Sequence, residues 1–226
     1  MKQNVFLVLE GCDGSGKSTI RQYIFAKLWA SNQECLTVGQ HGWHIPKYTE
    51  VIVNVRNRRC TYPQEKILEA YVQDKKVHYE RTIRPHLQKR HVIADRYIYT
   101  DIVYHSVLHS IDVQTTYTAH LQAGTVIPDY VVFVDAPLDV TMDRIRRRAR
   151  SRRWWEQEEY LSMIYRRYHE IFFEKPLPNL PPVIRVDNSR DGHSWMEQVD
   201  TLVLQGIFNV KPSPSLRKTP LSSNWG

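Results

Sequence analysis

Residues 11 to 18 read GCDGSGKS, and this stretch decides the fold because it matches G-x-x-x-x-G-K-[ST] in full. The apolar run VFLVLE precedes it and the helical pattern TIRQYIFAKLWA follows it, as a phosphate-binding loop requires. Gly11, Gly14 and Gly16 let successive backbone N–H groups face one anion, and the helix N-terminus adds its positive dipole end. The stretch therefore predicts a nucleotide phosphate site; the alternative is a glycine-rich turn that happens to precede a lysine.

Side-chain chemistry assigns roles within this loop. Lys17 would reach the β- and γ-phosphates of ATP, and the Ser18 hydroxyl would ligate Mg²⁺. We expect the cofactor ATP to be bound by the loop and the first turn of the helix, namely by Gly11, Asp13, Gly14, Ser15, Gly16, Lys17, Ser18 and Thr19.

Length and composition restrict the class of protein. The 226 residues are 42% hydrophobic, enough for one sizeable core, and no apolar run approaches the roughly twenty residues of a membrane span. The N-terminus enters a strand at once without an export signal, so we expect a cytoplasmic protein. Three scattered cysteines argue against a disulfide framework and a zinc site. The net charge of +7 fits a polyanionic partner but does not distinguish nucleotides from nucleic acids or acidic surfaces.

Apolar strand-like runs alternate with helical patterns, which predicts an α/β fold with a parallel sheet. The strand runs are 5–10, 35–40, 91–95, 130–135 and 182–187. The helical patterns are 17–30, 48–58, 64–90, 98–109, 113–123, 137–149, 156–174 and 192–207. Nucleotides bind such folds at the carboxyl ends of the strands, where Glu10, Asp95 and Asp135 lie. We expect one domain over 1–208 and a disordered tail, rich in Pro and Ser, over 209–226.

Two further segments carry candidate residues. In ADRYIYTDIVYH (94–105), Asp95 could hold metal-bound water and Arg96 could neutralise a phosphoryl group, whereas an isolated Asp-Arg pair would only cap a helix. Residues 144 to 153 carry seven arginines, which repel one another unless an anion gathers them. This run predicts a mobile lid over about 147–156 that closes on a polyphosphate; a solvated basic helix face is the alternative.

Five segments, in this order and spacing, resemble the thymidylate kinase family from about residue 4 to 207. They are EGCDGSGKST, QDKKVHYERTIRPHL (73–87), IADRYIYTDIVYH, PDYVVFVDAP (128–137) and RIRRRARSRRWWEQEEY. The resemblance implies a three-layer P-loop NTPase fold, with a five-stranded parallel sheet flanked by helices and an arginine-rich lid, usually as a homodimer. It also implies transfer of the ATP γ-phosphoryl group, with Mg²⁺, to a deoxynucleoside monophosphate, and dTMP is the substrate we expect.

The resemblance implies roles for five substrate-side residues. Asp13 would hydrogen-bond the sugar 3′-hydroxyl, and Arg96 would bind the acceptor phosphate. Tyr71 would stack on the base, and Tyr104 would pack where a 2′-hydroxyl would otherwise fit. Thr100, within the same DRY segment as Arg96, is included with the substrate residues.

The resemblance also implies a catalytic arginine in the lid, because positions 12 to 15 are Cys-Asp-Gly-Ser and hold no arginine. The expected catalytic residues are Lys17, Asp95, Arg96, Arg148, Arg150 and Arg153. Ser18 and Asp95 are the expected metal ligands.

Three departures from the family pattern bear on the substrate. Lys75 replaces a base-reading arginine, and Asp101 replaces a neutral polar residue. Lysine as donor and aspartate as acceptor would read the lactam edge shared by thymine, uracil, hydroxymethyluracil and guanine, unless the changes are neutral. The turn 44–46 lacks an acceptor-phosphate arginine, for which Lys47 is a candidate substitute.

Two alternatives to a dTMP kinase stay open at this stage. One is a P-loop kinase acting on a modified base in DNA, or on another lactam-edge nucleotide such as dUMP, hydroxymethyl-dUMP or dGMP. Nucleic acid would be a partner only in the first of these cases. The other alternative is a non-catalytic nucleotide-binding module, against which Asp95, Arg96 and the arginine run argue.

Overall fold

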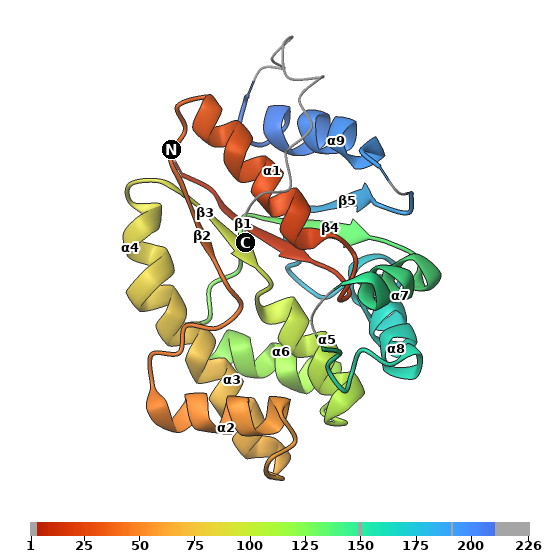
Figure 1. Ribbon diagram of the computed structural model, residues 1–226. Coiled ribbons are helices and arrows are strands. Elements are labelled where there is room, and N and C mark those ends of the chain that lie inside the picture. The colour runs from red at the N-terminus through yellow and green to blue at the C-terminus, as the bar shows by residue number, and fades with distance from the viewer. Residues whose placement is uncertain (1–3, 149–150, 191, 211–226) are drawn as a thin grey trace.

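Five parallel strands form one sheet in the order β2-β3-β1-β4-β5 (Figure 1). The computed structural model describes residues 4–148, 151–190 and 192–210. The strands are β1 (Phe6–Glu10), β2 (Cys35–Val38), β3 (His91–Asp95), β4 (Tyr130–Asp135) and β5 (Val183–Asp187). All five lie within one residue of the predicted strands except β2, which ends two residues early. The sheet confirms the predicted parallel α/β fold.

The register of the central strand brings two candidate segments together. Leu9 of β1 lies opposite Asp95 of β3 on one side and Val132 of β4 on the other. The glycine-rich loop therefore leaves the sheet beside Asp95 and Arg96, at the carboxyl edge. β1 is buried along its whole length because helices cover both faces, which explains the apolar run 6–9 that precedes Glu10.

Helices connect the strands and form two outer layers. Their bounds are α1 (Lys17–Ala30), α2 (Pro46–Arg56), α3 (Gln64–His78), α4 (Arg84–Leu87), α5 (Ile98–Leu108), α6 (Val113–Gln122), α7 (Leu138–Arg147), α8 (Glu158–His169) and α9 (Ser194–Gln198). Three wider, π-helical segments continue α3, α8 and α9: η1 (Tyr79–Ile83), η2 (Glu170–Glu174) and η3 (Val199–Gln205).

Each face of the sheet has its own core. α1 and α9–η3 pack on the face that carries Leu7 and Leu9, whereas α5 and α8 pack on the face that carries Phe6 and Val8. A third apolar cluster joins α2 to α3 through Val51, Ile52, Ile67 and Ala70. Figure 1 shows this helix pair at the end of the molecule away from α1 and α9. The pair forms one wall beyond the carboxyl edge of the sheet.

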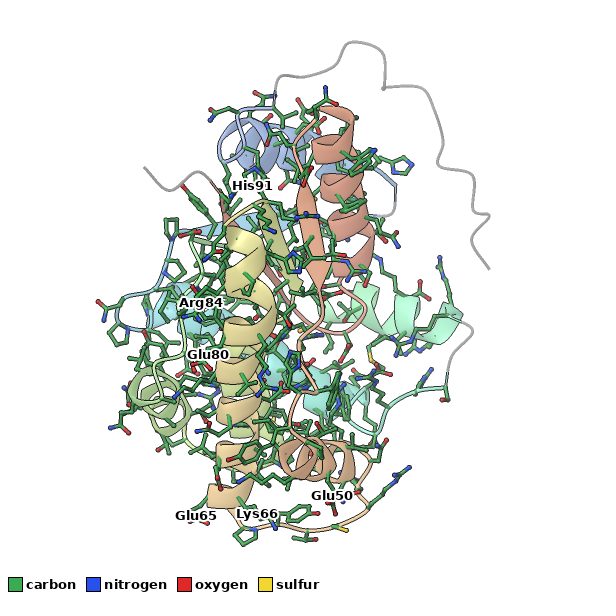
Figure 2. The ribbon with its side chains drawn as sticks, turned by 90° about the vertical axis from the view of Figure 1, so that its left-hand side faces the viewer. Glu50, Glu65, Lys66, Glu80, Arg84 and His91 are labelled. Atoms are coloured by element: carbon green, nitrogen blue, oxygen red, sulfur yellow. The ribbon has the colours of Figure 1, made fainter. Side chains whose placement is uncertain are left out.

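The helix predicted over 64–90 is continuous from α3 through η1 to α4. Figure 2 shows it from the side, from Glu65 and Lys66 at one end past Glu80 and Arg84, with His91 of β3 beyond its far end. The wider turn η1 ends at Ile83, two residues before Pro85, which has no N–H for the regular helical hydrogen bond. The helix therefore keeps its direction while its hydrogen-bond pattern changes.

Some element ends differ from the prediction for visible reasons. α2 begins at Pro46 rather than 48, because proline is favoured in the first turn. α8 begins at Glu158 rather than 156, and the Glu156 side chain before it is fully buried. Val210 packs into the α1-side core, so the packed chain extends past 208; residues 211–226 of the predicted tail lie outside the described residues. Within the described ranges, no helix has the length and apolarity to cross a membrane.

Candidate active site at the carboxyl edge of the sheet

A cavity of about 670 Å³ opens at the carboxyl edge of the sheet. The glycine-rich loop and the start of α1 line one end, and residues from α2, α3 and α5 line the other. Asp95 and Arg96 lie between these two ends, and residues from α7 and from the α7–α8 connection complete the wall. One cavity thus joins the predicted ATP-phosphate residues to the predicted substrate residues.

Tight backbone packing holds the glycine-rich loop in shape. Gly14 and Gly16 have φ angles of 82° and 94°, a region that favours glycine. A Cβ on Gly16 would lie 2.3 Å from the Asn188 amide nitrogen, which itself donates a 2.7 Å hydrogen bond to the Ser15 carbonyl. The loop is therefore braced from the β5 side, and its N–H groups are preorganised for an anion.

Lys17 is folded onto its own loop. Its Nζ donates to the carbonyl oxygens of Gly11 at 2.9 Å and Cys12 at 2.6 Å, and the side chain is nearly buried. Burial first, and then the nearby Arg96 charge, lowers the pKa of Lys17 from 10.5 to about 8. The two carbonyl oxygens are neutral and compensate the Lys17 charge only in part. A bound phosphate would supply a full anionic partner.

Ser18 and Asp95, the two expected metal ligands, lie side by side. The Ser18 hydroxyl is 3.4 Å from Asp95 Oδ2, and Arg21 Nη1 is 3.5 Å from the same oxygen. Across the residues that the structure describes, no three His, Cys, Asp or Glu side chains gather as a metal site. Mg²⁺ that enters on ATP needs few protein ligands, so one hydroxyl and one carboxylate fit it.

Arg96 lines the cavity and has a strained backbone conformation. Its φ of 74° is unusual for a residue with a side chain. Its guanidinium donates to Asp13 at 3.2 Å and Thr100 at 3.1 Å and lies over the Tyr104 ring. Burial would raise the pKa of Asp13, but the Arg96 and Lys17 charges lower it overall, so the carboxylate stays ionised. Asp13, Arg96, Thr100 and Tyr104 therefore form one hydrogen-bonded group.

Glu10 fixes the segment that follows Arg96 through hydrogen bonds to Tyr97 and Thr100. It is fully buried and accepts hydrogen bonds from the backbone N–H of Tyr97 at 2.8 Å and from the hydroxyls of Thr100 and Tyr168. Burial raises the pKa of Glu10. Asp135, the third carboxylate at a strand end, forms an ion pair with Arg185 at 2.6 Å and does not line the cavity. Of these three carboxylates, only Asp95 lines the cavity.

Three arginines of the run 144–153 line the cavity. Arg144, Arg148 and Arg153 line it, whereas Arg150 lies outside the described residues. The Arg148 guanidinium forms an ion pair with the buried Glu156 carboxylate. Glu156 also accepts the Arg153 backbone N–H at 2.8 Å. Burial lowers the pKa of Arg153. The mobile lid itself stays a prediction.

Two tryptophans of the α7–α8 connection donate hydrogen bonds to other parts of the cavity wall. Trp155 is buried and its indole N–H donates to Asp13 Oδ2 at 2.9 Å, the oxygen that also accepts the Tyr104 hydroxyl at 3.0 Å. The Trp154 indole N–H donates to the Arg56 carbonyl of α2 at 3.0 Å. The connection therefore contacts both the glycine-rich loop and the far wall.

Tyr71 of α3 lines the far end of the cavity, where it was expected to stack on a base. Its ring meets those of His105 at 4.6 Å and His41 at 5.4 Å, edge to face. Burial lowers the pKa of His105 to about 3, so the ring is neutral. Gln40 and Arg56 line the same end of the cavity.

Lys75 and Asp101 do not occupy the expected positions. Both are fully buried, neither lines the cavity, and Lys75 Nζ lies 3.1 Å from Asp101 Oδ2. They neutralise each other because an unpaired buried charge would be costly, so the expectation that both contact the base directly does not match the structure. Lys47 is also elsewhere: it lies over the Tyr48 ring, outside the cavity lining.

Sequence reasoning missed several residues of the cavity wall, among them Gln40, Arg56, His105 and Trp155. Gln40 follows β2 and Arg56 ends α2. Neither belongs to a motif, and both reach the cavity through the tertiary packing of their elements. The consecutive tryptophans within a basic run were a usable signal, since large aromatics rarely occur in a solvated basic face. In the structure Trp155 is buried and Trp154 is half-buried.

The sequence of this chain is similar to those of known proteins. The protein-family model for thymidylate kinase matches residues 9–177, about three quarters of the chain. The chain is similar to a probable thymidylate kinase of Methanococcus vannielii, with 31% identity over 74% of this chain and 78% of that protein. It is 25% identical to a thymidylate kinase of Leptospira interrogans over 91% of this chain and 97% of that protein. A thymidylate kinase of Ureaplasma parvum serovar 3 is 25% identical over 83% of this chain and 80% of its own length.

Proposed function

This chain belongs to the thymidylate kinase family, and from that premise we propose that it transfers the γ-phosphoryl group of ATP to dTMP. Membership makes it a nucleoside monophosphate kinase, a phosphotransferase. The observation that carries the choice of a free mononucleotide is the single cavity that joins the glycine-rich loop to Arg96 and Tyr71. Trp154 and Trp155 fasten one side of that cavity, which suits a small acceptor better than polymeric DNA.

Binding of ATP engages the loop end of the cavity. Lys17 exchanges its two carbonyl partners for the β- and γ-phosphates, and the loop N–H groups bind phosphate oxygens. Ser18 and Asp95 would hold Mg²⁺, which neutralises developing charge on the phosphates when bound. The residues of this chain thereby orient the γ-phosphoryl group toward the centre of the cavity.

The acceptor is held from the opposite end. Arg96 binds the acceptor phosphate, and Asp13 is placed by Arg96 and Tyr104 to accept a hydrogen bond from the sugar 3′-hydroxyl. Tyr71 stacks on the base. Arg153, and Arg148 from the same connection, carry positive charge toward the group in transfer, where phosphoryl transfer needs it most. The homodimer and the cytoplasmic location expected from the sequence stay predictions.

A substrate panel tests this proposal. The full chain is incubated with ATP, Mg²⁺ and, in separate reactions, dTMP, dUMP, dCMP, dGMP or double-stranded DNA, and both ADP and the phosphorylated product are measured. We expect transfer to dTMP. Lys17→Ala and Asp95→Ala should lower the rate by one to three decades, because each removes a charge contact worth about two to four kcal/mol in the transition state. Transfer to DNA but to no mononucleotide would replace this proposal with a DNA-base kinase.

A further inference from the structure

Gln40 and Arg56 form a polar row at the base end of the cavity. Gln40 follows β2 and Arg56 ends α2, so they come from two elements that carry no recognised motif. Both side chains are half-buried and line the cavity, and Arg56 Nη1 donates to Gln40 Oε1 at 3.3 Å. On the other side, Gln40 Nε2 donates to Asp101 Oδ1 at 2.9 Å.

The chemistry of its neighbours fixes the orientation of the Gln40 amide. Asp101 is ionised, because the Lys75 charge outweighs burial and lowers its pKa, so its carboxylate only accepts hydrogen bonds. Arg56 only donates. The amide nitrogen must therefore face Asp101 and the amide oxygen must face Arg56, and a flipped amide would place like groups together at both ends. The buried Lys75–Asp101 pair thus acts on the cavity through Gln40.

Arg56 is anchored in the same way. Its Nη1 also donates to His41 Nε2 at 2.9 Å, so this nitrogen is the acceptor and His41 Nδ1–H donates to Asp74 at 2.9 Å. Burial and the Lys75 charge lower the pKa of His41 to about 4, which keeps the ring neutral. Within the described part of the chain, Arg56 Nη2 and Nε have no hydrogen-bond acceptor, so their donors are left for a ligand.

We propose that Arg56 and Gln40 read the Watson–Crick edge of the base and select the imide of thymine or uracil. Along the row, Arg56 offers a donor, Gln40 Oε1 an acceptor and Gln40 Nε2 its second N–H as a donor. Thymine and uracil present the complementary order of carbonyl, N–H and carbonyl. Cytosine presents a donor and two acceptors, and guanine an acceptor and two donors, so each leaves unpaired polar groups against the row.

This inference rests on the proposed function and deepens it. A lysine and an aspartate in direct contact with the base would accept guanine as readily as thymine, because both share the lactam edge. A row of three groups distinguishes the two bases at its third position. The planar guanidinium of Arg56 also supplies a rigid fork that the buried Lys75 does not. The expected discrimination is therefore against dGMP as well as dCMP.

Calorimetric binding of dTMP, dCMP and dGMP to the full chain tests the row. The variants are Arg56→Met and Gln40→Met, and the matched controls are Arg59→Met and Gln114→Met, whose side chains are exposed. We expect the wild type to bind dTMP about a hundredfold or more tighter than dCMP and dGMP. Each row variant should weaken dTMP binding about ten- to a hundredfold while dCMP binding changes less than about threefold. The controls should keep the wild-type ratios.

ATP affinity, measured on every variant, reports whether the loop end of the cavity remains folded. A folded Arg56→Met variant that keeps the wild-type preference for dTMP over dCMP and dGMP would overturn the proposal, whatever the stability of Gln40→Met. Phosphoryl transfer from ATP to each mononucleotide is measured on the same variants, so that failure of the base-reading proposal can be distinguished from failure of the proposed function. If the wild type phosphorylates dTMP and the variants keep its selectivity, the proposal for Arg56 and Gln40 is wrong but the proposed function stands. If no mononucleotide is phosphorylated, the proposed function is wrong as well.

Discussion

ATP affinity should fall with rising pH because of Lys17. The pKa of this lysine is about 8 in the nucleotide-free protein, since burial and the Arg96 charge oppose its ammonium form. Bound phosphates favour the ammonium form and should return the pKa to 10.5 or above. Between pH 8 and pH 10.5, ATP therefore binds together with a proton, and its affinity drops about tenfold for each pH unit. The full span corresponds to roughly 3.4 kcal/mol.

Calorimetry from pH 7 to pH 10, in paired buffers of different ionisation enthalpy, measures both the affinity and the proton uptake. We expect no uptake at pH 7 and nearly one proton at pH 9.5. The neighbouring Cys12 thiol does not interfere, because burial raises its pKa to about 12. Lys17→Met should bind ATP weakly at every pH and without uptake. A wild-type affinity that is constant up to pH 10, or a Lys17→Met variant with the same slope, would refute this account of the lysine.

Three further predictions concern the loop, the connection and the sugar site. Gly16→Ala should lower the free energy of unfolding by about 1–3 kcal/mol in urea titrations, because its Cβ meets a braced amide at a positive φ; Gly124→Ala, with a positive φ but open space around it, should cost less. Arg153→Ala should reduce kcat far more than it raises the KM for ATP, whereas the exposed Arg152 should tolerate alanine; an effect on KM alone would make Arg153 a ground-state contact. Tyr104→Ala should reduce the preference for deoxyribose over ribose in kcat/KM, and an unchanged preference would remove Tyr104 from the sugar site.

The parts of the structure that sequence could predict are those governed by neighbours along the chain. GCDGSGKS specifies a strand, a loop and a helix within about 25 residues, and α1 begins and ends at the predicted residues. β3 and β4 also match their predicted ranges, because both are short apolar runs bounded by polar residues. Asp95 and Arg96 reach the loop because parallel strands bring their carboxyl ends to one edge.

The base end of the cavity could not be predicted in this way. Lys75 and Asp101 occupy positions that the family pattern assigns to base recognition, yet their opposite charges pair in the interior, and this pairing depends on how α3 packs against α5. The role proposed for Arg56 likewise depends on where α2 ends relative to the cavity. Such contacts join residues that are distant in sequence, and no local periodicity encodes them.

Asp13 belongs to both halves of the cavity at once. Its backbone is part of the loop that faces one anion, and its carboxylate is bonded to Arg96, Tyr104 and Trp155 on the other side. The spacing between the two halves therefore depends on the length of this one side chain and its hydrogen bonds, as well as on the packing of β3 and α5. A side chain one methylene longer, as in Asp13→Glu, would change that spacing while keeping charge and chemistry. The length of the Asp13 side chain therefore contributes to the alignment of the phosphoryl donor with the acceptor.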